Sequence, residues 1–156
     1  MKTLIVYYSR SGHSKKVAEI LKDKMNADVE VIEMVEPYPE DEKPHYLKFG
    51  FEAMAGSKPP IKPLKANPAD YDLVIIGSPT WNWRITPPVL SFLHKYPMKG
   101  KKIALYVSAG GDGIKCMGRF RKKVKGSEIV GTYIASDSKA TEIPEQLTKW
   151  VTELTF

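Results

Sequence analysis

Two kinds of apolar pattern alternate along the chain. Short runs rich in β-branched and aromatic residues predict buried strands at residues 3–8, 73–77, 101–108 and 129–135. A further run, 29–35, has apolar residues at every second position, so we expect a strand nearer to an edge of the sheet. The run 73–77 is the most strongly apolar and indicates a central parallel strand covered on both faces.

The segments between these runs carry a helical period. In residues 13–25 one face collects the apolar side chains Val17, Ile20, Leu21 and Met25. Pro87 and Pro88 open a second helix, because the first positions of a helix need no amide donor. Its apolar face comprises Val89, Leu90, Phe92 and Leu93. A basic helix ends near Val124. The last helix is predicted at 141–154, and its side chains that face the sheet are Ile143, Leu147, Trp150, Val151 and Leu154.

Residues 36–69 have the least regular pattern. Prolines stand at both ends of the segment, at Pro37, Pro39 and Pro44 and again at Pro59, Pro60, Pro63 and Pro68. Between them a helix is suggested, despite Gly50, by one face carrying Tyr46, Phe49, Ala53 and Met54. The pattern leaves open whether this segment shapes a substrate pocket or a dimer contact.

Strands and helices that alternate in this way, with no repeat or linker, predict a single α/β domain over residues 1–156. Parallel strands joined by right-handed crossovers form a doubly wound five-stranded sheet with helices on both faces. In such sheets ligands bind beyond the carboxyl ends of the strands, near the switch in strand order. The loops after the first, third and fourth strands are therefore the candidate binding loops.

Composition adds little to this picture. Of 156 residues, 42% are hydrophobic and 27% charged, as in soluble globular proteins. No apolar run approaches the roughly 18 residues of a membrane-spanning helix, and the N-terminus lacks a signal-peptide pattern. We therefore expect a cytoplasmic protein with no membrane partner. The single cysteine, Cys116, excludes an internal disulfide framework and fits a reducing compartment.

The net charge of +6 is partly concentrated in two clusters. Residues 99–102 hold three lysines, and residues 119–125 hold five basic side chains. These clusters suit a solvated face, a nucleic-acid surface or a surface that steers an acidic protein partner. We expect no nucleic-acid partner, because acidic residues interleave elsewhere and neither zinc-ligand spacing nor an RNA-binding aromatic motif occurs.

The first candidate loop is basic and rich in hydroxyls: Ser9, Arg10, Ser11, Gly12, His13 and Ser14. Its hydroxyls and the free amides of the following helix start can donate to one anion, and Gly12 permits a close backbone approach. A bound phosphate would explain why Arg10, His13, Lys15 and Lys16 stand at the positive end of a helix dipole. The spacing is neither that of a Walker motif nor GxGxxG, and the alternative is an ordinary serine cap with solvated lysines.

The second candidate loop, 78–86, contains two of the three tryptophans of the chain, Trp81 and Trp83. Tryptophan in a loop suggests either a plug on the core or a platform for a flat aromatic ligand, with Arg84 as an added donor.

The third loop is made of small residues, Ser108, Ala109, Gly110, Gly111, Asp112 and Gly113. It suits main-chain contacts to a heterocycle, or a turn that caps the next helix through Asp112. Because all three loops follow parallel strands, they fall at one end of the sheet. A ligand with a phosphate at one end and a flat polar ring at the other fits this set, and FMN is such a molecule.

At this point the chain resembles the flavodoxin-like family over nearly its whole length. The stretch 9–14 is similar to that family's phosphate loop, Thr/Ser-x-Thr/Ser-Gly-x-Thr/Ser, and Gly77-Ser78-Pro79-Thr80-Trp81 looks like its flavin loop. The resemblance implies a sheet in the order 2-1-3-4-5, in a short-chain form, with noncovalent FMN. It implies that the phosphate is held by Ser9, Arg10, Ser11, Gly12, His13 and Ser14. It also implies that the isoalloxazine lies between Pro79, Thr80, Trp81, Asn82 and Trp83, with its pyrimidine edge at Ser108, Ala109, Gly110, Gly111, Asp112 and Gly113.

Three departures from the family pattern bear on function. This chain is basic where many electron carriers are acidic, its second loop lacks the glycine that many relatives place beside the flavin, and its third loop lacks the covering tyrosine. The outer face of the flavin could therefore be open to a substrate.

The resemblance implies electron transfer through the flavin, with no catalytic side chain and no metal ion. The expected partner is a redox protein, an acidic one included, or a small-molecule acceptor. A small FMN-dependent NAD(P)H or quinone reductase is the alternative, and a flavin-free binding module on the same fold is the second. Cys116, His45 and His94 are interpreted as structural or surface residues.

Overall fold

The computed structural model describes residues 1–39 and 46–154, and of residues 46 and 47 only the backbone. Its five parallel strands pair in the order β2-β1-β3-β5-β6, which is 2-1-3-4-5 when the parallel strands alone are counted. They are β1 (Thr3–Tyr7), β2 (Asp28–Val31), β3 (Leu73–Trp81), β5 (Lys102–Ala109) and β6 (Glu128–Ser136). The predicted class and strand order are confirmed.

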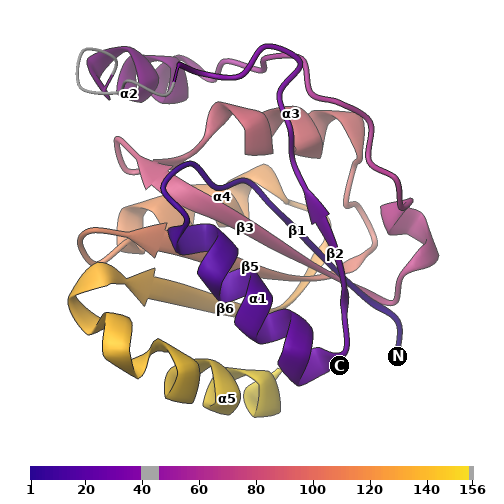
Figure 1. Cartoon of the computed structure of the whole chain (residues 1–156). Coiled ribbons are helices and arrows are strands. Elements are labelled where there is room, and N and C mark those ends of the chain that lie inside the picture. The colour runs from indigo at the N-terminus through magenta and orange to yellow at the C-terminus, as the bar shows by residue number, and fades with distance from the viewer. Residues whose placement is uncertain (40–45, 155–156) are drawn as a thin grey trace.

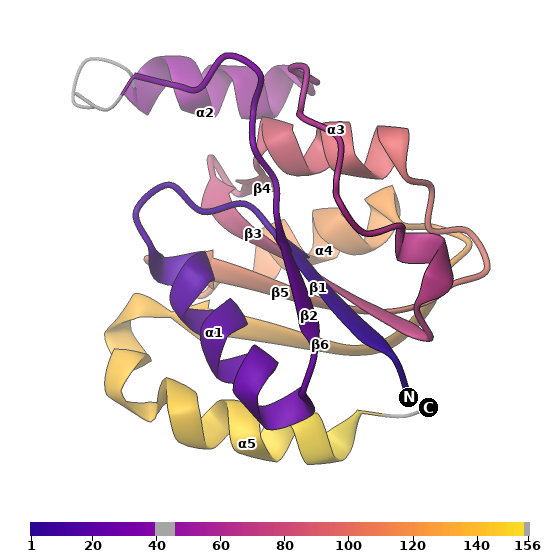
Figure 2. The ribbon, with the colours of Figure 1, turned by 45° about the vertical axis from the view of Figure 1, so that its right-hand side comes forward.

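Helices cover both faces of this sheet (Figure 1). One face carries α1 (His13–Met25) and α5 (Ile143–Glu153), and the other carries α3 (Pro87–Lys95) and α4 (Ile114–Lys123). The fifth helix, α2 (Tyr46–Ala55), lies beyond α3 and contacts β3 and the short strand β4 (Arg84–Ile85) (Figure 2). None of the helices in the described part of the chain has the length and apolar character needed to cross a bilayer.

The central strand β3 is buried between two layers of helices, as its continuous apolar run predicts. Val74 and Ile76 pack with Val89 and Phe92 of α3 on one side. On the other side the core is formed with α1 and α5 by Ile5, Leu73, Ile75, Val17, Leu21 and Leu147. Burial of this apolar surface is the main driving force for folding.

Gly77 of β3 allows the aromatic ring of Tyr106 on β5 to cross the backbone. A Cβ atom at Gly77 would lie 2.0 Å from Cζ of Tyr106, far inside contact distance. Tyr106 is fully buried, and its hydroxyl donates a hydrogen bond of 2.9 Å to the carbonyl oxygen of Ser14 in α1. The absence of a side chain at Gly77 therefore allows the side chain of Tyr106, on the neighbouring strand, to reach the start of α1.

The strand expected at 29–35 is shorter than predicted. β2 ends at Val31, and the following residues pair with another segment: Met34 forms an antiparallel bridge with Ile61, and Val35 donates to the carbonyl of Pro60 at 3.0 Å. β2 is an edge strand, as expected. The alternating pattern of 29–35 was wrong about the end of the strand because the same residues serve two different pairings.

The segment 36–69 contains the suggested helix, but its apolar face differs in part. Phe49 and Ala53 are buried, whereas Met54 is 51% exposed. The expectations for Pro44, His45 and the side chain of Tyr46 lie outside the described residues. The final helix also begins differently, because residues Asp137–Glu142 form a 3-10 helix, η3, and α5 starts only at Ile143.

Candidate functional site

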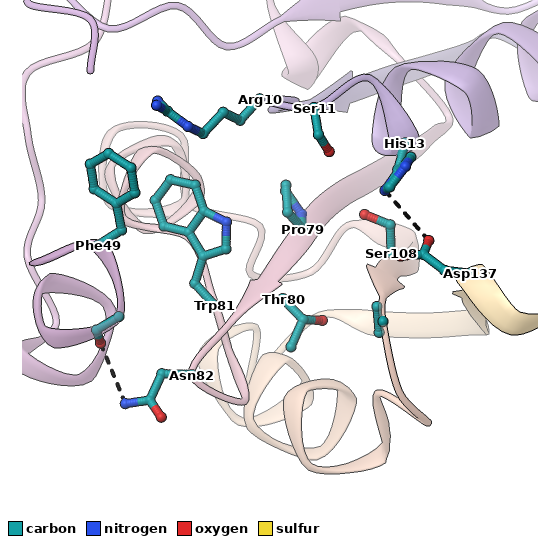
Figure 3. A pocket seen from close by; sticks show the side chains of 13 residues that line it. Arg10, Ser11, His13, Phe49, Pro79, Thr80, Trp81, Asn82, Ser108 and Asp137 are labelled. Atoms are coloured by element: carbon teal, nitrogen blue, oxygen red, sulfur yellow. Dashed lines mark hydrogen bonds and ion pairs between the residues drawn. The ribbon is translucent and has the colours of Figure 1, made fainter. Parts of the chain in front are cut away.

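A cavity of about 320 Å³ opens beyond the carboxyl ends of β1, β3 and β5 (Figure 3). Residues of all three candidate loops line it, together with residues of α2 and η3. The lining consists of Arg10, Ser11, His13, Phe49, Gly50, Pro79, Thr80, Trp81, Asn82, Ser108, Ala109, Gly110 and Asp137. Its size falls within the range typical of small-ligand sites.

The first loop presents the start of α1 to this cavity. Gly12, in the left-handed region with φ of 94°, is the N-cap of α1, and its amide donates to the hydroxyl of Ser9 at 3.1 Å. The helix has no side-chain cap and no acidic residue in its first turn. Arg10, Ser11 and His13 line the cavity, whereas Ser9 and Gly12 shape the turn. The amides and the dipole of the helix therefore favour an anion here.

Ser14, expected at the phosphate, has a structural role in this structure. It is buried, and its hydroxyl lies 2.9 Å from that of Ser108 in the third loop. This hydrogen bond ties the beginning of α1 to the end of β5.

The second candidate loop, residues 78–86, is part of a β-hairpin in the structure and not a loop. β3 continues to Trp81, and β4 pairs with it antiparallel, Thr80 opposite Ile85 and Trp81 opposite Arg84. Asn82 and Trp83 both have positive φ, 49° and 58°, the pattern of a type I′ turn. The expectation of a loop over 78–86 was wrong because this turn lacks the glycine by which such hairpins are usually recognised.

The two tryptophans of this hairpin lie in different surroundings. Trp81 lines the cavity and stacks on Phe49 of α2, with ring centroids 5.3 Å apart and planes at 20° (Figure 3). Trp83 is 60% exposed at the turn, where Lys115 lies 5.6 Å from the centre of its ring. The structure brings Trp81 to the cavity and leaves Trp83 outside it, because the turn directs them to different sides.

The third loop divides in the same manner. Ser108, Ala109 and Gly110 line the cavity. Beyond them, Asp112 accepts a hydrogen bond of 3.0 Å from the amide of Ile114, and Gly113, with φ of 68°, is the N-cap of α4. The second half of this loop therefore forms the turn into α4, the alternative reading of its sequence.

Two groups of cavity residues were not predicted from the sequence. Phe49 and Gly50 come from α2, and the guanidinium of Arg10 lies 4.5 Å from the ring centre of Phe49. Asp137 follows β6, and its carboxylate lies 3.4 Å from Nδ1 of His13. Position after a parallel strand was a usable signal for Asp137, but nothing local marked Phe49.

Burial and hydrogen bonding control the ionisable groups near the cavity. Tyr38, whose ring lies against Trp81 at 5.6 Å, has a pKa raised by burial and by its 2.9 Å hydrogen bond to the carboxylate of Glu52. Burial also raises the pKa of the Cys116 thiol. The hydroxyl of Thr80 is buried without an oxygen or nitrogen partner among the described residues, and the Cys116 thiol beside it is only a weak partner.

The donor set of the cavity fits a ligand that is anionic at one end and flat at the other. Ser11 and His13 lie at the start of α1, and Trp81 lies across the cavity beside Phe49 (Figure 3). The guanidinium of Arg10 points towards Phe49 and lies on the aromatic side of the cavity. No group of three or more residues able to ligate a metal occurs in the described ranges.

Comparison with solved structures gives the same architecture. A protein from Bacteroides eggerthii is 24% identical over 96% of this chain and 98% of its own, with a TM-score of 0.78. A flavoprotein from Lactobacillus acidophilus, solved in complex with FMN, is 26% identical over 96% and 98% of the two chains, with a TM-score of 0.69. Oxidised flavodoxin 2 from Bacillus cereus is 20% identical over 98% and 97%, with a TM-score of 0.62.

No curated protein sequence matches this chain significantly. The family model for flavodoxin, in contrast, matches residues 2–154, which include every strand and helix described above. With that match, and with the sheet order and the cavity at its carboxyl edge, the chain belongs to the flavodoxin family.

Proposed function

We propose that this protein binds FMN noncovalently in the cavity at the carboxyl edge of the sheet and transfers electrons through it. The observation that carries the proposal is the meeting of three segments, distant in sequence, around one cavity with the uncapped start of α1 at one end and an aromatic wall. The FMN complex of the related Lactobacillus flavoprotein supports it.

The start of α1 would hold the phosphate. Its first-turn amides have no side-chain cap, and Ser11 and His13 add a hydroxyl and an imidazole beside them. Asp137 lies 3.4 Å from Nδ1 of His13 and orients the imidazole. Preorganised donors of this kind bind an anion without having to be assembled first.

The opposite wall would hold the ring. Trp81 is fixed by its stacking on Phe49 and by an edge contact to Tyr8, so its indole is already positioned to pack against a flat ligand. The main chain of Ala109 and Gly110 offers polar contacts to ring edges. Bound FMN supplies the redox chemistry, and the residues of the protein bind it, orient it and set its electrostatic surroundings.

The test is a titration of the flavin-free protein with FMN, followed by quenching of flavin fluorescence. We expect saturable binding and a yellow complex. Trp81→Leu should weaken binding by up to about tenfold, the loss of one aromatic stacking contact. Trp83→Leu, the same change two positions away and outside the cavity, should leave the dissociation constant within about twofold. A colourless protein that does not quench FMN would instead favour the flavin-free binding module.

A small FMN-dependent reductase is the second candidate. The participation of α2 favours it, because Phe49 and Gly50 extend the cavity beyond the three cofactor loops. Rapid mixing of the FMN-loaded protein with NADPH or NADH under anaerobic conditions separates the two roles: fast bleaching of flavin absorbance indicates a reductase, and unchanged absorbance an electron carrier. The cytoplasmic location expected from the sequence stays a prediction.

A further inference from the structure

A second hollow, separate from the cavity described above, lies between α2, the β3–β4 hairpin, α3 and α4. It measures about 330 Å³. Its apolar lining includes Ala53, Ile85 and Leu90, all buried. Around this floor stand four cationic side chains, Arg84, Arg119, Lys122 and Lys123, and we call the hollow with these four residues the basic groove.

The two arginines of the basic groove are held in place by the hairpin turn. Nη1 of Arg84 donates to the carbonyl of Asn82 at 3.0 Å, and Nη1 of Arg119 donates to the carbonyl of Trp83 at 2.9 Å. A guanidinium fixed through one nitrogen keeps its other donors in a defined direction, which suits a carboxylate.

The positive charge of the basic groove is not balanced locally. In residues 1–39 and 46–154, none of its four cations forms an ion pair with a carboxylate. Residues 113–127, which contain all of α4, include no aspartate or glutamate. The groove therefore presents a field that attracts acidic surfaces.

Exposed apolar side chains border the same region. Met54, which lines the groove, is 51% exposed, and Trp83, whose carbonyl binds Arg119, is 60% exposed. Tryptophan, methionine and arginine are the residues enriched at protein interfaces. An apolar floor with a cationic, aromatic rim is suited to a protein partner more than to solvent.

The basic groove adjoins the cavity proposed for FMN. Gly50 and Asn82 line that cavity and touch each other, with Nδ2 of Asn82 3.4 Å from the carbonyl of Gly50. The next turn of α2, at Ala53, and the next residues of the hairpin, at Arg84, line the groove. A partner seated in the groove would lie directly beside the flavin.

We propose that the basic groove docks an acidic one-electron donor protein, which places an apolar side chain on the groove floor and carboxylates against its four cations. This inference rests on the proposed function. In each encounter one electron leaves the redox centre of the donor, which is oxidised, and enters the flavin, which is reduced, and solvent supplies the proton that the reduced ring takes up. A nucleic acid fits less well, because no aromatic side chain is among the residues that line the groove, and Trp83 at its rim offers one stacking surface and not a series of them.

A plant-type [2Fe–2S] ferredoxin, an acidic protein, serves as the probe. Its oxidised form is titrated into the flavin-free chain by calorimetry at about 50 and about 300 mM salt, which differ in screening length. Its reduced form is mixed with the FMN-loaded chain in a stopped-flow instrument. We expect Lys122→Glu/Lys123→Glu to weaken binding and to slow flavin reduction by about tenfold or more at low salt. Both lysines are exposed, so the fold should survive.

Lys99→Glu/Lys125→Glu is the matched control, with the same charge change at two other exposed lysines, outside the groove. It should change both readouts by less than about threefold. The proposal is overturned if ferredoxin does not bind or if its affinity is the same at both salt concentrations. It is also overturned if the two double variants lose the same amount of affinity and of flavin reduction rate. Tighter binding of a single-stranded oligonucleotide, or a dimer of this chain abolished by the groove variant, would assign the groove to another occupant.

The experiment distinguishes failure of the proposed FMN binding from failure of the proposed docking site. If the chain takes up no FMN, the titration of the flavin-free protein still decides whether an acidic protein binds the groove. If FMN binds and ferredoxin does not, only the groove assignment falls.

Discussion

The hydroxyls of Ser14 and Ser108 lie 2.9 Å apart in a buried hydrogen bond, although 94 positions separate them in the chain. The bond joins the first turn of α1 to the end of β5, at the floor of the cavity. Beneath it, the hydroxyl of Tyr106 donates to the carbonyl of Ser14. The geometry of the candidate site is therefore determined by contacts that belong to the core.

Replacing Ser14 by alanine should destabilise the fold, because the Ser108 hydroxyl would lose its buried partner. We expect a loss of about 1–2 kcal/mol in the free energy of unfolding, measured by urea denaturation. Ser11→Ala is the control, since Ser11 is exposed and its loss should change stability by less than about 0.5 kcal/mol while weakening FMN binding. Equal stability of the two variants would show that the buried bond contributes nothing.

Gly77→Ala should be among the most damaging single changes. The added methyl would overlap the buried ring of Tyr106, and neither strand can move away within the sheet. We expect a loss of about 1–3 kcal/mol or more, the cost of overpacking. Gly118→Ala in α4, where nothing lies within 4 Å of the new methyl, should instead stabilise the protein by about 0.5–1 kcal/mol. Thermal melting of both variants tests this contrast.

Trp83→Gly should raise the melting temperature. Trp83 adopts φ of 58°, which is unfavourable for a residue with a side chain, and Asn-Gly is the preferred pair for a type I′ turn. The gain of about 1 kcal/mol corresponds to roughly 2–4 °C for a chain of this size. A lower melting temperature would mean that the contact between Lys115 and the indole outweighs the backbone strain.

Tyr71→Phe should flatten the alkaline loss of stability. The hydrogen bond of 2.6 Å to Asp28, aided by burial, raises the pKa of Tyr71 to about 12. A pKa above the unfolded value of about 10 means that this contribution is present below pH 10 and is lost as the pH rises from about 10 to about 12. Urea midpoints of the two proteins should differ at about pH 8 and converge towards pH 12. A constant difference across this range would contradict the assignment.

Hydrophobic periodicity alone predicted most of the fold. The bounds of α1 agree with the predicted range 13–25, and each parallel strand was located. The pattern succeeded there because each element buries one face, or two, against its neighbours. It failed where pairing is decided at long range, as between Met34 and Ile61, and where the turn of the β3–β4 hairpin lacks the usual glycine.

The candidate site was predictable only in part. Ser11 follows β1, Thr80 and Ser108 lie at the ends of β3 and β5, and the parallel arrangement of these strands placed them at one edge. Phe49 reaches the cavity because α2 packs on Trp81, a contact with no local signal in the sequence. Trp81 and Trp83 look equivalent in the sequence, and the turn between them gives them different surroundings.

One part of the cavity lining, from Pro79 to Trp81, is the end of the central strand β3, whereas Phe49, which stacks on Trp81, belongs to a helix outside the main sheet. Amide exchange in the strand part of the lining should therefore be nearly as slow as in the interior, since it opens only when the sheet opens. Substitutions that change ligand selectivity should therefore be tolerated in the helix, whereas substitutions in the strand would also destabilise the fold.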